Sequence, residues 1–119
     1  MITGLDHVQL AMPVGEEDTA RAFYCDILGM EERQKPAHLR GRGGCWFHAP
    51  GVELHLGVED LFRPAAKAHP ALLVDNLEKV RETLELNGVD FSPGAPLDGY
   101  LRGDIHDPFG NRIELMQEL

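Results

Sequence analysis

Hydrophobic and polar residues alternate at the start of the chain, as is typical of a β-strand with one buried face. Over residues 5–12, one set of side chains is apolar and is expected to face a core: Val8, Leu10 and Met12. The intervening set includes His7 and Gln9, so the opposite face of this strand must look toward something polar. A proline and a glycine follow the strand and end it.

A helical pattern comes next. Apolar residues recur at the spacing of a single helical stripe: Ala20, Phe23, Tyr24, Ile27 and Leu28. The pattern predicts a helix over residues 16–28, with acidic residues in its first turn and Gly29 as its C-terminal cap. Three strands are then expected, the last after a Pro50-Gly51 turn: Met30–Gln34, Gly44–His48 and Val52–Val58. The first half of the chain is therefore predicted to be β-α-β-β-β.

The second half repeats this order. A strand is expected over residues 69–74, and Pro70 within it favours an edge position or a bulge because proline has no backbone N–H to donate. Asp75, with Glu78 three residues later, has the spacing of a helix-capping box, and Asn87-Gly88 ends the helix. Its apolar stripe is Leu77, Val80 and Leu84. The remaining strands are expected at Val89–Ser92, Gly99–Ile105 and Arg112–Gln117, with a turn at 108–111 before the last.

The chain is thus predicted to be an α+β protein of two βαβββ modules, residues 1–58 and 68–119, joined by a linker at 59–67. His7 and His69 open the two modules at matching places, and Glu53 and Glu114 lie in their last strands. Histidine and carboxylate together are ligands for divalent metals. The repeat therefore predicts one metal site built from two related halves.

Composition narrows the range of partners. The formal net charge is −9 and no basic stretch stands out, so nucleic acid and anionic membranes are poor partners. There is no apolar run of membrane-spanning length and no signal-peptide pattern, which makes the cytoplasm the default expectation. Cys25 and Cys45 lack the spacing of a zinc or redox motif and are expected to be free thiols.

Three segments of the chain are GLDHVQLAM, FYCDILGM and HDPFGNRIELM. Their order and spacing resemble the vicinal oxygen chelate superfamily, which includes glyoxalase I, fosfomycin-resistance enzymes, extradiol dioxygenases and bleomycin-binding proteins. The resemblance covers essentially the whole chain. It implies that each βαβββ module curls into half a barrel and that paired modules enclose a metal-lined cleft. It also implies a homodimer and a small-molecule substrate.

The resemblance implies specific metal ligands. His7, His69 and Glu114 correspond to the three ligands of the fosfomycin-resistance and extradiol members. Glyoxalase I has a fourth, acidic ligand that corresponds to Glu53. His55 is expected on the same face as Glu53, so either residue is a candidate for fourth ligand or catalytic base.

Three functions follow as alternatives. The favoured one is lyase- or isomerase-type chemistry on a substrate that chelates the metal through neighbouring oxygens. The others are an Fe(II) ring-cleaving dioxygenase and a metal-free antibiotic-binding protein. The ligands are nitrogen and oxygen only, which suits Mn, Ni, Co, Fe, Zn or Mg without choosing among them.

Other polar or aromatic residues in the strands are candidates for lining the cleft, but the sequence does not fix which face of the strand each one occupies. They are Gln9, Trp46, His48, Arg102, Asp104 and His106. The Gly-rich connection with His38, Arg40 and Arg42 is expected to be a mobile loop.

Overall fold

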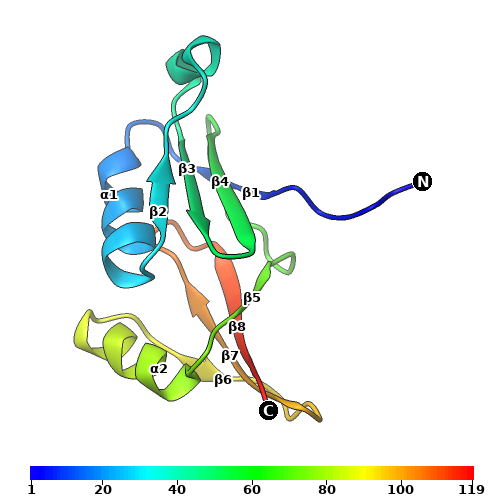
Figure 1. Cartoon of the computed structure of the whole chain (residues 1–119). Coiled ribbons are helices and arrows are strands. Elements are labelled where there is room, and N and C mark those ends of the chain that lie inside the picture. The colour runs from blue at the N-terminus through cyan, green and yellow to red at the C-terminus, as the bar shows by residue number, and fades with distance from the viewer. The chain divides into compact units, whose positions relative to one another are not determined.

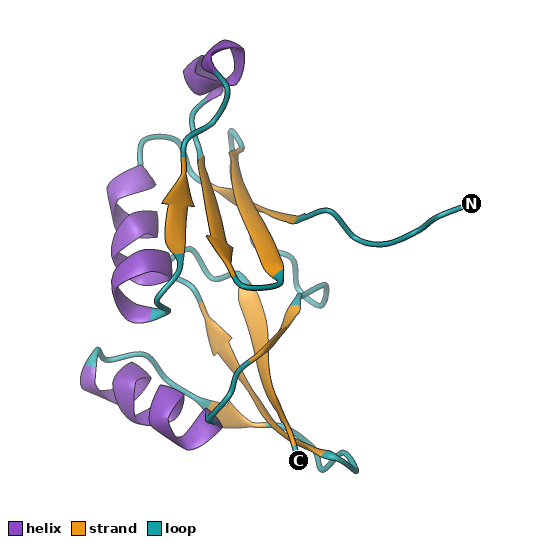
Figure 2. Cartoon of the chain, viewed as in Figure 1, coloured by secondary structure: helices purple, strands orange, loops and turns teal.

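The computed structural model describes all residues, 1–119, and divides the chain into two compact units, Met1–Arg63 and Pro64–Leu119. The boundary falls inside the expected linker at 59–67. Each unit contains one four-stranded sheet and one main helical segment, and Figure 2 shows each helical segment lying against its own sheet. None of the helices has the length and apolar character that a membrane span needs.

The first unit follows the predicted β-α-β-β-β order (Figure 1). Its elements are β1 (Val8–Met12), α1 (Glu17–Arg21) continuing into π-helical turns η1 (Ala22–Ile27), β2 (Glu31–Arg33), the 3₁₀ helix η2 (Ala37–Arg42), β3 (Cys45–Ala49) and β4 (Val52–Val58). The strand order is β1-β4-β3-β2, with β1 parallel to β4 and the other pairs antiparallel. The loop expected around His38 contains the 3₁₀ helix, which the sequence pattern did not predict.

The second unit has the same topology. Its elements are β5 (Ala71–Leu73), α2 (Leu77–Leu86), β6 (Ser92–Pro93), β7 (Tyr100–His106) and β8 (Arg112–Glu118). The strand order is β5-β8-β7-β6, and β5 is parallel to β8 just as β1 is parallel to β4. The predicted repeat is therefore confirmed at the level of strand order and direction. β5 is also the edge strand that Pro70 favoured.

Alternation along the strands gives each sheet one apolar and one polar face. In β4, Leu54 and Leu56 are buried, and Phe47 of β3 stacks on Tyr24 of η1 with 5.2 Å between ring centroids. These side chains face the helix. In the second unit the corresponding core residues are Leu77, Leu84, Ile105, Ile113 and Leu115. Residues at the intervening positions of the strands project from the opposite face of each sheet, and this face carries the candidate site.

Both thiols are free, as expected. Cys45 is buried at the start of β3, and burial raises the pKa of its thiol to about 11 because the charged thiolate is disfavoured away from water. Cys45 is therefore a packing residue.

Two sequence-based boundaries are wrong. The strand expected at Val89–Ser92 is the shorter β6, Ser92–Pro93, because only these residues pair with β7. The N-cap of α2 is Asn76, one residue beyond Asp75, and its side-chain oxygen accepts a hydrogen bond from the Lys79 backbone N–H at 3.0 Å. Asn and Asp are equally good caps, so residue type could not decide between these neighbours.

The cap gives a matched test. We expect Asn76→Ala to lower the free energy of unfolding by about 0.5–2 kcal/mol, since it leaves a helix N–H without its acceptor. Asp75→Ala, the control next to it, should change stability far less. Urea unfolding followed by circular dichroism measures both, and a larger loss for Asp75→Ala would contradict the observed cap.

Candidate functional site

The polar face of the first unit gathers residues from three neighbouring strands. Gln9 lies opposite His55 across the β1–β4 pair, and Trp46 lies opposite His55 across the β3–β4 pair. His48 lies opposite Glu53. The strand register therefore settles what the sequence left open: Gln9, Trp46 and His48 share one face with Glu53 and His55.

Three rings on this face are stacked. His55 lies between Trp46 and His7, with 4.2 Å between ring centroids on each side and interplanar angles of 6° and 18°. We call Trp46, His55 and His7 the aromatic stack. His55 is only 7% exposed, and its pKa is lowered, chiefly because burial disfavours the imidazolium and secondarily because His7 is close. The neutral ring is therefore the favoured form of His55.

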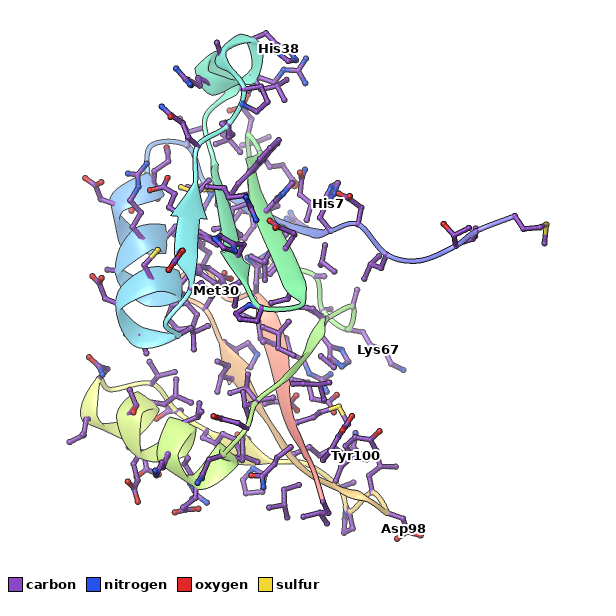
Figure 3. All side chains as sticks on the ribbon, in the orientation of Figure 1. His7, Met30, His38, Lys67, Asp98 and Tyr100 are labelled. Carbon is purple, nitrogen blue, oxygen red and sulfur yellow. The ribbon has the colours of Figure 1, made fainter.

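His7 precedes β1 and is partly exposed (Figure 3). Its Nδ1 lies 2.9 Å from the Asp6 carboxylate, which can only accept, so Nδ1 carries the proton. The lone pair of a neutral His7 ring is then on Nε2. Metal-binding histidines commonly have this arrangement, in which one ring nitrogen donates to a carboxylate or carbonyl and the other binds the ion.

Glu53 is held by a neighbouring cation. Arg33 Nε donates to both carboxylate oxygens, at 2.9 and 3.2 Å, and the Glu53 side chain is 30% exposed. The sequence indicated Glu53 as a candidate ligand or base but gave no sign of this partner. Arg33 and Glu53 belong to different strands, β2 and β4, that are separated by β3. Only the folded sheet brings them together.

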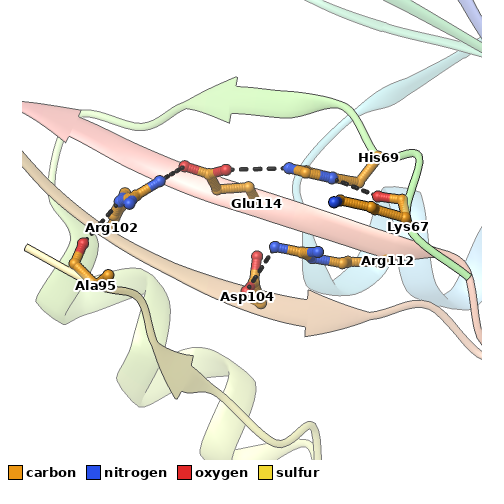
Figure 4. Close-up of polar contacts among 7 residues, drawn as sticks. All are labelled: Lys67, His69, Ala95, Arg102, Asp104, Arg112 and Glu114. Atoms are coloured by element: carbon orange, nitrogen blue, oxygen red, sulfur yellow. Dashed lines mark hydrogen bonds and ion pairs between the residues drawn. The ribbon is translucent and has the colours of Figure 1, made fainter. Parts of the chain in front are cut away.

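The polar face of the second unit centres on Glu114 of β8 (Figure 4). Its side chain is 10% exposed, and its two oxygens have different partners. Oε1 lies 3.1 Å from His69 Nε2, and Oε2 accepts a hydrogen bond from Arg102 at 3.2 Å. The structure thus brings together His69 and Glu114, and adds Arg102 as a partner that the sequence named only as a possible cleft residue.

Both ring nitrogens of His69 face oxygens that can only accept: Nδ1 lies 2.9 Å from the Lys67 carbonyl oxygen, and Nε2 lies 3.1 Å from Glu114 Oε1. A neutral ring has one N–H and can donate to one of these oxygens but not to both. With its proton on Nδ1, the ring points the lone pair of Nε2 at the Glu114 carboxylate, which is repulsive. A second proton or a metal ion between the two atoms removes this repulsion. Two ligand atoms that each lie about 2.1 Å from one metal ion, at right angles to each other, are about 3 Å apart. The distance of 3.1 Å between His69 Nε2 and Glu114 Oε1 is therefore compatible with a shared divalent metal.

Asp104 lies directly opposite Glu114 in the β7–β8 pair. Its carboxylate instead forms an ion pair with Arg112, at 3.2 Å. Two carboxylates side by side would repel each other. Here Arg102 forms an ion pair with Glu114, and Arg112 forms one with Asp104, so each carboxylate has its own cationic partner. Asp104 is therefore already neutralised within the second unit.

The predicted ligands are divided between the units: His7 and Glu53 in the first, His69 and Glu114 in the second. The structure contains no group of three or more His, Cys, Asp or Glu side chains that could hold a metal ion. The second unit contains the His69–Glu114 contact, and neither unit by itself brings three of the predicted ligands together.

Comparison with known proteins identifies relatives over the whole chain. A family model of the Glyoxalase/Bleomycin resistance protein/Dioxygenase superfamily matches residues 4–115. A glyoxalase family protein from Bacillus anthracis is 45% identical, with 100% of this chain and 98% of that chain covered and a TM-score of 0.95. No curated protein matches the sequence significantly.

More distant solved structures share the fold. The fosfomycin resistance protein FosX from Listeria monocytogenes is 20% identical, with 100% of this chain and 96% of that chain covered and a TM-score of 0.77. A glyoxalase/dioxygenase from Nostoc punctiforme is 24% identical, with coverages of 93% and 89% and a TM-score of 0.74. At these identities the likeness concerns the fold alone.

Proposed function

Since the chain belongs to the Glyoxalase/Bleomycin resistance protein/Dioxygenase superfamily, we propose that it is a divalent-metal-dependent enzyme. Its reaction is of the lyase or isomerase type, on a small substrate that chelates the metal through neighbouring oxygens. The observation that carries this proposal is the contact between His69 Nε2 and Glu114 at 3.1 Å, with the Nδ1 proton of His69 directed to the Lys67 carbonyl. A cation between these two groups explains why they face each other.

In this proposal His7, His69 and Glu114 hold the metal and Glu53 completes or assists the site. Glu114 is the anchor because it is nearly buried and its second oxygen is fixed by Arg102. His7 and His69 bind through Nε2, since each has its Nδ1 proton directed to an oxygen. The nitrogen and oxygen ligands suit Mn, Ni, Co, Fe(II), Zn or Mg.

The bound ion supplies stabilisation of negative charge on the substrate oxygens. The chain supplies the proton transfer. Glu53 is ionised beside Arg33, so its carboxylate can accept a proton from the carbon next to the chelating oxygens and return it at a neighbouring position. Arg33 keeps Glu53 in one place on the sheet. His55, on the same strand and face, is the alternative base.

A second candidate function is supported by the ion pair between Arg33 and Glu53. If Glu53 stays on Arg33, the ligands are His7, His69 and Glu114, a two-histidine, one-carboxylate set that leaves positions open on iron for oxygen. This arrangement favours an Fe(II) ring-cleaving dioxygenase. Metal analysis of untagged protein, followed by assays with 2-oxoaldehyde adducts, catechols and fosfomycin, separates the two functions.

We also propose that the protein is a homodimer, with His7 and Glu53 of one subunit serving the same metal as His69 and Glu114 of its partner. Two equivalent sites follow from twofold symmetry. Light scattering should report twice the monomer mass at micromolar concentration. A stable monomer with full metal content would exclude this arrangement.

Metal binding is expected to need both units. His7→Ala and His69→Ala should each remove most of the bound metal, because each takes away one of few ligands. His38→Ala is the control, since His38 lies on η2 at the tip of the β2–β3 connection (Figure 3). Metal content per chain is measured by inductively coupled plasma spectrometry after dialysis. Full occupancy in His69→Ala would show that the ligand set is wrong.

The two glutamates are expected to have unequal roles. Glu114→Gln should lower metal affinity, because it removes the charge that anchors the ion. Glu53→Gln should keep most of the metal but reduce kcat by about 10²–10⁴-fold, the usual effect of losing a general base. Titration calorimetry measures the metal affinity. Steady-state kinetics, with whichever substrate the assays above identify, measures kcat. Unchanged activity in Glu53→Gln with an iron-loaded site would favour the dioxygenase.

A further inference from the structure

The three rings of the aromatic stack are nearly parallel, although they come from separate parts of the sheet. Trp46 comes from β3, His55 from β4, and His7 from the segment just before β1, so the stack crosses three neighbouring strands. Trp46 and His55 are direct cross-strand partners and almost parallel, at 6°. His7 continues the same stack on the other face of His55, at 18°.

His7 depends on this contact for its orientation. The ladder between β1 and β4 begins only at Val8, paired with Leu54, so His7 lies just outside it. The hydrogen bond to Asp6 joins adjacent residues, and the Asp6 side chain is 94% exposed. Such an exposed contact between neighbours does little to restrict a ring. The ring of His55 stacks on the His7 ring with 4.2 Å between centroids, and Trp46 stacks on His55 in turn at the same separation.

We propose that Trp46 and His55 are positioning residues that fix the plane of the His7 imidazole for metal binding, with His55 acting through its ring face and not as a ligand. The inference rests on the proposed function, because it takes His7 as a metal ligand. A ring that is already held in one orientation loses less freedom when it binds an ion. Stacking engages one face of the His7 ring and not its nitrogen edge, so it can orient the ring without using Nε2.

The first experiment changes the far end of the stack, which touches no proposed ligand. Trp46→Leu removes the flat ring, and Trp46→Phe keeps one. Titration of the metal-free proteins with Mn²⁺ should show affinity about 10–100-fold weaker for Trp46→Leu, the usual effect of losing a group that orients a ligand, and nearly restored for Trp46→Phe. His38→Ala is the control, since His38 lies on η2 outside the stack and outside the proposed ligand set.

The second experiment separates positioning from ligation by His55. His55→Phe preserves a flat ring but has no nitrogen, whereas His55→Leu preserves neither. The proposal expects His55→Phe to bind Mn²⁺ nearly as well as the wild type and His55→Leu to bind it about 10–100-fold more weakly. Loss of binding in His55→Phe as complete as in His7→Ala would show that His55 is a ligand. Equal, wild-type affinity in Trp46→Leu and His55→Leu would show that the stack has no positioning role.

A metal-free measurement distinguishes failure of this inference from failure of the proposed function. Nuclear Overhauser effects between the His7 and His55 rings should be present in the wild type, retained in Trp46→Phe and lost in Trp46→Leu. If wild-type protein binds no metal through His7, the proposed function is wrong, while these ring contacts still decide whether Trp46 holds His7. If the ring contacts persist in a folded Trp46→Leu variant, the positioning inference is wrong even when the metal site is right.

Discussion

The account depends on one contact, in which His69 Nε2 faces the nearly buried carboxylate of Glu114 while His69 Nδ1 faces a backbone carbonyl oxygen. An ionised carboxylate facing an unprotonated nitrogen at this distance is unfavourable, so the pair must share a proton or a metal ion. Arg102 compensates one oxygen of Glu114 and leaves the other directed at the histidine. The proposed metal site requires a metal ion to take the place of that proton between the two groups.

The duplicated fold offers the same positions in the first unit, but the residues there use them differently. Glu53 is more exposed than Glu114 and is paired with Arg33, while His7 stacks on His55 instead of facing a carboxylate across the sheet. The units are therefore alike in topology and unequal in chemistry. In the proposed function, Glu114 therefore anchors the metal, while Glu53, held by Arg33, has the assisting role.

Much of the fold could be predicted from the sequence because it follows from local patterns. The alternation in residues 5–12, the helical stripe ending at Gly29 and the repeat of both in the second half are local, and the order of elements that they predicted is confirmed. Contacts across strands were harder to predict. The partnership of Arg33 with Glu53 and the stacking of Trp46 on His55 depend on a register that only the assembled sheet fixes. Asp6 was the exception, since it is adjacent to His7 and could have been recognised as its partner.

The central claim is that one cation is shared by His69, Glu114 and His7. A crystal structure of the protein grown with Mn²⁺, with an anomalous difference map collected near the manganese edge, tests it most directly. The account predicts a single strong peak per chain at about 2.0–2.3 Å from His69 Nε2, a Glu114 oxygen and the Nε2 atom of a His7 that belongs to the other subunit of the dimer. A map with no peak between His69 and Glu114, or a peak there with His7 remote from it, would contradict the account.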